Sequence, residues 1–215
     1  RSAMQVITPG VSDVPGPCSA GVKHAARTQL KLPVDGRGLL FVGNDFRKKG
    51  LPALLEAMIQ LPADVWLGVV GEGEQGGAMC RRVAELKLGK RVHFLGALSD
   101  MSAAYQAADC LVHPTLEDTY AMVVLEAMAQ GLPVVVSAAK YCGISAELQD
   151  GVNAVLLEDP KSATAISNAV LRLLADDAAV STMGRNATEF AVLHTWPQVA
   201  AIHEALYERV APAHK

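Results

Sequence analysis

Apolar and polar positions alternate in blocks along most of this chain, and the blocks predict a succession of strands and helices. From Leu39 onward, short apolar runs that suit buried strands are followed by stretches in which apolar residues recur every third or fourth position, the spacing of an amphipathic helix. The expected strands lie at residues 39–43, 64–70, 92–95, 109–113, 133–137 and 154–157. The expected helices lie at residues 51–61, 78–88, 101–108, within 118–130, and at 163–175, 177–192 and 196–209.

This order of elements predicts the fold class. Strands that alternate with helices form an open parallel sheet with right-handed crossovers, so we expect an α/β, Rossmann-like domain with helices on both faces of the sheet. The chain has 51% hydrophobic and only 19% charged residues, a balance that suits strands covered on both faces. Residues 1–38 differ, because they are rich in Pro and Gly and contain one short helical stretch at 22–30. They are interpreted as an interdomain linker ahead of a domain at 39–215.

Composition and charge exclude several classes of function. The net charge of −3 and the pI near 6.1 leave no overall basic field, so no nucleic-acid partner is expected. No apolar run approaches the roughly 18 residues that a membrane-spanning helix requires. The four cysteines form no CxxC pair and have no histidine at zinc-ligand spacing, which favours free thiols in a reducing, cytoplasmic compartment without structural zinc.

The stretch 111–137 carries the strongest candidate site. It predicts a strand, a loop with acids, a helix that contains Glu126, and a second strand, and ligands bind at the carboxyl ends of such strands. Asp118 and Glu126 can be read simply as a loop acid and an exposed helical residue. However, Glu126 has apolar neighbours on nearly all sides, where a carboxylate is costly without a partner. The two hydroxyls of a ribose would provide that partner, because an ionised glutamate can accept two hydrogen bonds in a fork. The N–H groups at the helix start, residues 119–122, favour a phosphate or sugar oxygens.

The basic run Arg47, Lys48 and Lys49 follows a predicted strand and precedes a predicted helix, at the same edge of the sheet as Asp118. A charge run of this kind is often only a solvated surface loop. At this edge, however, lysine can neutralise a diphosphate and the charge that develops as it departs. His113, at the end of a strand, is interpreted as a satisfied core histidine rather than a base.

Four segments match a known pattern in order and spacing: VGNDFRKKG (42–50), VVGEGE (69–74), HFLGALSD (93–100) and DTYAMVVLEAMAQGLPVVV (118–136). Together they resemble the nucleotide-sugar-binding, C-terminal half of GT-B-fold retaining glycosyltransferases of family 4, over about residues 39–157. Two details resemble the lipopolysaccharide core glucosyltransferases of that family, which add glucose to inner-core heptose. They are the acidic-aromatic pair before the basic run and Cys142-Gly143 where most members carry Gly-Gly.

The resemblance implies roles for individual residues. Asp118 would be the catalytic residue and would contact the sugar hydroxyls, and Glu126 would bind the ribose. The residues implied to bind the sugar donor in addition are Gly43, Arg47, Lys48, Lys49, Gly71, Ala97, Tyr120, Ala121 and Met122. The chain departs from the family pattern at three positions, because Asp118 replaces a Glu, Ala121 replaces a Gly, and Asn44 stands where many members have Arg.

The resemblance also implies a reaction: transfer of a hexose from a nucleotide sugar, UDP-glucose, to a glycan acceptor, the lipopolysaccharide core, with retained configuration. No metal or other cofactor is expected, since Lys48 and Lys49 would stabilise the leaving diphosphate. The acceptor would bind an N-terminal domain absent from this chain, which opens on Arg1. The fragment alone is therefore expected to be inactive, and the full-length enzyme to associate peripherally with the inner face of the inner membrane. A non-catalytic nucleotide-binding module and a GT-B-fold UDP-sugar epimerase fragment remain alternatives; the paired-acid motif favours the transferase.

Overall fold

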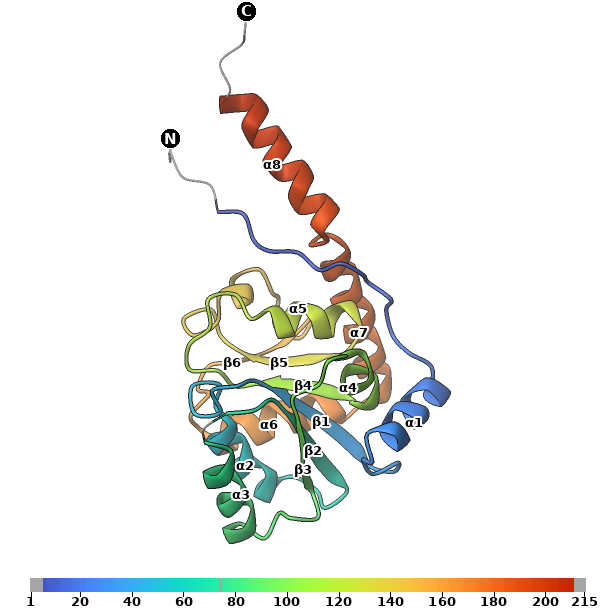
Figure 1. Cartoon of the computed structure of the whole chain (residues 1–215), viewed down its shortest axis with the longest axis vertical. Coiled ribbons are helices and arrows are strands. Elements are labelled where there is room, and N and C mark those ends of the chain that lie inside the picture. Colours follow the sequence, from blue (N-terminus) through green and yellow to red (C-terminus); the bar gives the residue numbers. More distant parts are fainter. Residues whose placement is uncertain (1–5, 74, 211–215) are drawn as a thin grey trace, which may run out of the picture.

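The computed structural model describes residues 6–73 and 75–210. Its centre is a six-stranded sheet in the order β3-β2-β1-β4-β5-β6, in which all paired strands run parallel (Figure 1). The strands are β1 (Arg37–Val42), β2 (Val65–Val70), β3 (Val92–Gly96), β4 (Cys110–His113), β5 (Val134–Ser137) and β6 (Val155–Leu157). The prediction of an open, parallel, Rossmann-like sheet is confirmed.

Helices cover both faces of this sheet. They are α1 (Ala20–Gln29), α2 (Leu51–Gln60), α3 (Gly76–Glu85), α4 (Ser102–Ala107), α5 (Met122–Ala129), α6 (Ala163–Leu174), α7 (Asp177–Val192) and α8 (Trp196–Val210), with one 3₁₀ turn at Gly143–Ala146. The predicted helices are all present, with ends that differ by a few residues. The largest difference is at α3, which ends at Glu85 because Lys87 adopts a left-handed backbone conformation (φ 58°) that closes the helix.

The core is divided into two halves by the sheet, because successive side chains of a strand point to opposite faces. In β1, Leu39 and Phe41 pack in the cluster that contains α2, α3 and α6. Leu40 and Val42 pack on the other face, in the cluster that contains α4 and α5. All of these β1 side chains are at most 9% exposed, which explains why strands with a continuous apolar sequence form the interior of the molecule.

The segment before β1 lies against the domain. Val11 forms a parallel bridge with Thr195, just before α8, and the N–H of Gly16 donates to the carbonyl of Ala129 at the end of α5. Helix α1 lies beside α4 (Figure 1), where Ala26 and the ring of Trp66 belong to a third, small apolar cluster. Strand β1 begins at Arg37, two residues before the expected boundary at residue 39.

A buried carboxylate joins α1 to the sheet. Asp109, just before β4, accepts hydrogen bonds from Lys23 Nζ (2.5 Å), from Arg27 Nη2 (2.7 Å) and from the N–H of Gly38 (2.7 Å). Arg27 is only 5% exposed and also lies over the Trp66 ring, 5.1 Å from its centroid. Because both charges are removed from water, each depends on the other for its solvation.

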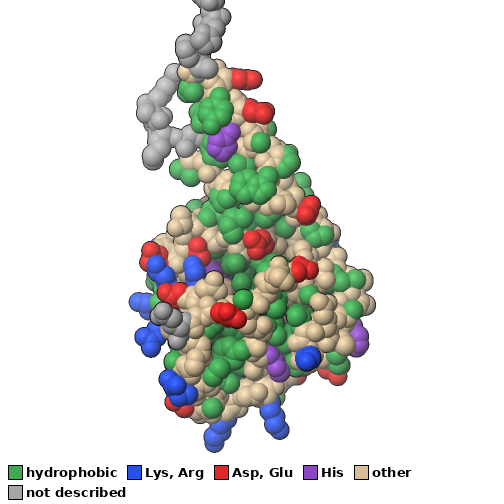
Figure 2. Space-filling model, in the orientation of Figure 1, with side chains coloured by type: hydrophobic (Ala, Val, Ile, Leu, Met, Phe, Trp, Pro, Cys, Tyr) green, Lys and Arg blue, Asp and Glu red, His purple; other side chains and the backbone are tan. Residues whose placement is uncertain are grey.

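Helix α8 projects from the body of the domain (Figure 1), and Figure 2 shows apolar side chains on its visible surface. Of its residues only Val199 is buried, whereas Trp196, Ile202 and Tyr207 are exposed. Within residues 6–73 and 75–210, no helix is long and apolar enough to cross a membrane.

We expect Asp109→Ala to lower the free energy of unfolding by about 3–5 kcal/mol, because it leaves the guanidinium of Arg27 buried without its carboxylate. Chemical denaturation monitored by circular dichroism measures the change. Asp177→Ala is the matched control, since Asp177 pairs with Arg37 on the surface and its loss should cost less than about 1 kcal/mol. Equal effects of the two variants would contradict the role assigned to Asp109.

Candidate functional site

The order of the strands determines where a ligand can enter. Strands β1 and β4 are neighbours, but the chain leaves β1 toward α2 on one face and β4 toward α5 on the other. The loops therefore diverge at the carboxyl ends of these two strands, and in open α/β sheets this switch point is the crevice in which ligands bind. Lys49 lies on the loop after β1 and Asp118 on the loop after β4. The Nζ of Lys49 is 2.6 Å from Oδ2 of Asp118, so the crevice brings together two of the residues predicted from the sequence.

Asp118 has three hydrogen-bond donors. Its Oδ2 contacts Lys49 and the Nε2 of His113 (3.1 Å), and its Oδ1 accepts from the N–H of Ala121 (2.9 Å). Burial alone would raise the pKa of Asp118, but the hydrogen bonds from His113 and Lys49 outweigh it and hold this pKa well below its usual value. Asp118 is therefore ionised at any physiological pH, which suits a group that stabilises positive charge and not one that donates a proton.

His113 is the residue whose role the sequence interpretation missed. It is fully buried, as expected of a core histidine, but it contacts Asp118 directly, and its Nδ1 is a buried atom without a hydrogen-bond partner among the described residues. Burial lowers the pKa of His113, although the nearby carboxylate of Asp118 acts in the opposite direction. The sequence feature that could have indicated this contact is the position of His113 at the end of β4, five residues before Asp118.

The loop after β1 is held in place by the side chain of Asp45 and by a backbone contact to the β4 loop. Asp45 accepts a hydrogen bond from the N–H of Lys48 (3.0 Å), and the carbonyl of Lys48 accepts one from the N–H of Leu116 on the β4 loop (2.8 Å). The side chain of Lys48 pairs with exposed Glu117 (3.1 Å). Arg47 is exposed and is held through its backbone, because its N–H donates to the side chain of Gln75 (3.0 Å) and its carbonyl accepts from the N–H of Gly50 (3.1 Å). The three basic residues therefore lie together at the rim, with Lys49 the most enclosed.

Gly43, Gly71 and Ala97 follow β1, β2 and β3 at the same edge. A side chain at Gly71 (φ 128°) would bring its Cβ within 2.1 Å of the carbonyl oxygen of Gly43, so only glycine allows these two loops to touch. The N–H of Gly71 donates to the carbonyl of Gly96, next to Ala97 (2.9 Å). Backbone contacts therefore bring these loops together, and the side chains of Asn44 and Glu72 add hydrogen bonds to the N–H groups of Glu72 (3.3 Å) and Ala97 (3.5 Å).

The start of α5 has an uncommon geometry. Ala121 has a left-handed backbone (φ 65°), a conformation that residues other than glycine, asparagine and aspartate rarely adopt. Its N–H donates a hydrogen bond to Asp118. Tyr120 precedes it and is half-buried, and Met122 opens the helix. Ala121, which stands where the family pattern has Gly, thus lies at the helix start, where N–H groups lack intrahelical acceptors.

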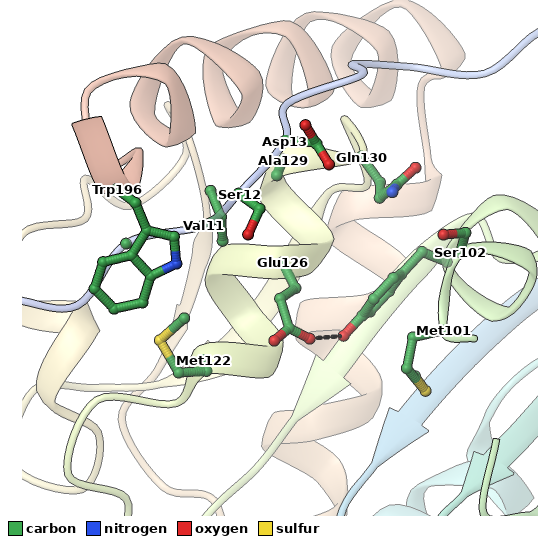
Figure 3. A pocket seen from close by; sticks show the side chains of 12 residues that line it. Val11, Ser12, Asp13, Met101, Ser102, Met122, Glu126, Ala129, Gln130 and Trp196 are labelled. Carbon is green, nitrogen blue, oxygen red and sulfur yellow. Dashed lines mark hydrogen bonds between the residues drawn. The ribbon is translucent and has the colours of Figure 1, made fainter. Parts of the chain in front are cut away.

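Glu126 lies one turn further along α5, in a pocket of about 410 Å³ (Figure 3). Its Oε2 accepts a hydrogen bond from the hydroxyl of Tyr105 on α4 (2.7 Å), so the partner that its apolar surroundings demand comes from the chain itself. Met122 and Trp196 also line this pocket, whereas Lys48 and Lys49 do not. The structure therefore forms two groups, a Lys49–Asp118 cluster and a Glu126 pocket, and the first residues of α5 connect them.

Other side-chain chemistry is sparse. Cys18, Cys80, Cys110 and Cys142 are free thiols, of which Cys110 and Cys142 are buried. In the part of the chain that the structure describes, no group of three or more His, Cys, Asp or Glu residues could hold a metal ion.

With this geometry in view, comparison with known proteins identifies the family. The sequence profile described as "Glycosyl transferases group 1" matches residues 22–190. The chain belongs to this glycosyltransferase family. Its match begins within α1 and includes every strand of the sheet and the whole Lys49–Asp118 cluster.

The chain is also similar to individual glycosyltransferases. The chain is 30% identical to a D-inositol 3-phosphate glycosyltransferase of Corynebacterium glutamicum, over 95% of this chain and 51% of the relative. It is 32% identical to the lipopolysaccharide glucosyltransferase WaaG of Escherichia coli, over 76% of this chain and 45% of the relative. The crystal structure of Anabaena Alr3699/HepE in complex with UDP-glucose is similar, with a TM-score of 0.84 and 25% identity over 96% of this chain and 57% of that one. The chain thus spans about half the length of these relatives.

The buried imidazole of His113 makes the free energy of unfolding depend on pH. The unfolded chain binds a proton at His113 below about pH 6.5, whereas the folded chain binds one only at a lower pH, because burial lowers this pKa. Since the unfolded state then binds more protons, the free energy of unfolding should fall between pH 7 and pH 5, by at most about 1.4 kcal/mol per pH unit for this group.

His113→Gln keeps an amide N–H near the position of Nε2 but cannot titrate, so denaturation of this variant should show a smaller fall over the same range. The carboxylates of the unfolded chain titrate near pH 4 and do not contribute strongly in this window. Burial also lowers the pKa of His93, so His93→Gln is the control variant that measures how much of the pH dependence of the free energy of unfolding comes from His93. An unchanged slope in His113→Gln would contradict the buried neutral state.

Proposed function

We propose that this chain is the nucleotide-sugar-binding half of a retaining glycosyltransferase that transfers glucose from UDP-glucose to a lipopolysaccharide core acceptor. The observation that supports it most is the Lys49–Asp118 pair, which lies at the crevice between β1 and β4 beside the start of α5. A cation, an ionised acid and free backbone N–H groups at one point provide for both ends of a sugar diphosphate.

Lys49 and Lys48 would bind the diphosphate together with the N–H groups at the start of α5. Both lysines already have carboxylate partners, Asp118 and Glu117, and a diphosphate brings more negative charge than either. As the bond to the sugar breaks, negative charge grows on the leaving oxygen, and fixed cations stabilise it without a metal ion. Lys49, held at the wall of the crevice, is already oriented for this role.

Asp118 would act on the sugar. Its low pKa keeps it ionised, so it favours a transition state with positive charge on the sugar ring more than it favours the bound ground state. Two of its contacts, from His113 and Ala121, fix its orientation, while the diphosphate competes for the third, from Lys49. The binding of the sugar donor would then leave an acceptor site on Asp118 free for a sugar hydroxyl.

Glu126 would bind the ribose in the neighbouring pocket, with Met122 at the boundary between the nucleoside and the phosphates. The similarity to a protein crystallised with UDP-glucose supports a uridine sugar donor. The acceptor is proposed from the motif details that the chain shares with lipopolysaccharide core glucosyltransferases and from the similarity to WaaG. The full-length enzyme would then work at the inner face of the inner membrane.

Calorimetric titration of the chain with UDP, GDP, ADP and their glucose conjugates tests the proposal. We expect UDP and UDP-glucose to bind at least about tenfold more tightly than the other nucleotides, with or without EDTA. Absence of UDP binding would exclude the proposed function. The acceptor is tested with the full-length gene product, because glucose transfer to an inositol phosphate in place of a lipopolysaccharide core would overturn that part of the proposal.

Lys49→Ala should weaken UDP binding by about 1.5–3 kcal/mol, the range for a hydrogen bond to a charged group. The measurement is the calorimetric dissociation constant, with unfolding midpoints recorded to verify the fold. Lys90→Ala is the control, because Lys90 is equally charged but exposed before β3, at the opposite edge of the sheet. UDP affinity that is unchanged in Lys49→Ala, or equally reduced in both variants, would refute the phosphate role.

A further inference from the structure

The hydroxyl of Tyr105 is the only hydrogen-bond donor that the described residues provide to the carboxylate of Glu126. Tyr105 lies on α4 and Glu126 on α5, and both line the pocket, so the hydrogen bond drawn as a dashed line at Glu126 in Figure 3 joins two helices. We propose that Tyr105 is a positioning residue: it holds the Glu126 carboxylate in the one orientation that receives the vicinal hydroxyls of a ribose. This inference rests on the proposed function, in which Glu126 binds the nucleoside.

The contact is well suited to fix an orientation. Tyr105 is 4% exposed and packs among the apolar residues of α4 and α5, so its ring has no freedom to follow a moving partner. The distance from its hydroxyl to Oε2 of Glu126 is 2.7 Å, that of a strong hydrogen bond to an ionised acceptor. Burial and the adjacent carboxylate raise the pKa of Tyr105 far above its usual value, so the phenol remains a donor at every physiological pH.

The second oxygen of the carboxylate remains available. Oε1 has no hydrogen-bond partner among residues 6–73 and 75–210, and Glu126 is only half-buried, on the wall of the pocket. A carboxylate accepts hydrogen bonds at both oxygens, and Oε2 keeps one further acceptor position beside Tyr105. Two adjacent hydroxyls can therefore bind in a fork, provided that the carboxylate plane is fixed.

Positioning matters here because a glutamate side chain has several rotatable bonds. Without a fixed partner, ordering it on binding costs conformational entropy, which reduces affinity. Tyr105 fixes this side chain before the ligand arrives. Ser102 and Met101 lie at the start of the same short helix and line the same pocket, so α4 provides both the wall and the orienting group.

The test is calorimetry on the chain with three ligands: UDP, 2′-deoxyuridine 5′-diphosphate and pyrophosphate. Tyr105→Phe removes only the hydroxyl and keeps the buried ring. We expect it to weaken UDP binding about tenfold, the effect of losing an orienting hydrogen bond. The preference of the chain for UDP over the 2′-deoxy ligand should shrink toward unity, and pyrophosphate binding should not change.

A variant cycle with Glu126→Gln separates positioning from general destabilisation. If Tyr105 acts through Glu126, Tyr105→Phe should cost less than about twofold in UDP affinity when Glu126→Gln is already present. This double variant also removes the buried charge, so it keeps the test informative if Tyr105→Phe alone folds poorly. Independent, additive losses would overturn the inference, and so would equal losses for UDP and pyrophosphate in Tyr105→Phe.

Different results would refute the proposed function and the positioning role of Tyr105. If the unaltered chain does not bind UDP, the proposed function is wrong and the positioning role falls with it. If the chain binds UDP, and Glu126→Gln weakens that binding while Tyr105→Phe leaves both the affinity and the ribose preference unchanged, the positioning role alone is refuted.

Discussion

The carboxylate of Asp118 is the point on which the carboxyl edge of this domain depends. It joins three segments that are far apart or differently folded: Lys49 after β1, His113 at the end of β4, and the N–H of Ala121 at the start of α5. A single ionised group thereby determines the separation of two loops and the direction in which a helix begins. Ala121 accepts a left-handed backbone as part of this arrangement, a conformation that costs about 1–2 kcal/mol in an ordinary residue.

A buried acid lies at the other end of β4. Asp109 precedes the strand and is satisfied by Lys23, Arg27 and the N–H of Gly38, so it ties α1 to the sheet. The two acids make similar contacts but have different access to ligands. Asp109 is enclosed at the amino edge, where its partners are permanent, whereas Asp118 lies at the crevice between diverging loops, where a ligand can exchange with a partner. The same chemistry therefore holds the structure together at one end of the strand and, in the proposed function, acts on a ligand at the other.

The sequence predicted most of the fold from local patterns. The six strands and their intervening helices were expected within a few residues, because apolar periodicity reports which positions must face a core. Helix ends were less well predicted, as at Lys87, since a left-handed terminating residue leaves little trace in hydrophobicity. For the site, the placement of Lys49 and Asp118 at the same edge of the sheet was expected from their position after predicted strands, although their pairing was not. The need of Glu126 for a partner was expected from its apolar surroundings.

The amino-acid sequence by itself thus determined the elements, the family pattern and the residues that carry charge at one edge of the sheet. Only the tertiary structure decided which groups those charges meet: Tyr105 beside Glu126, His113 beneath Asp118, and Arg27 against Asp109. The reason is physical. Periodicity and turn preferences act over a few residues, whereas these contacts join side chains whose distance depends on how strands pair and helices pack. Lys49 and Asp118, 69 positions apart in the chain, are neighbours only because β1 and β4 pair.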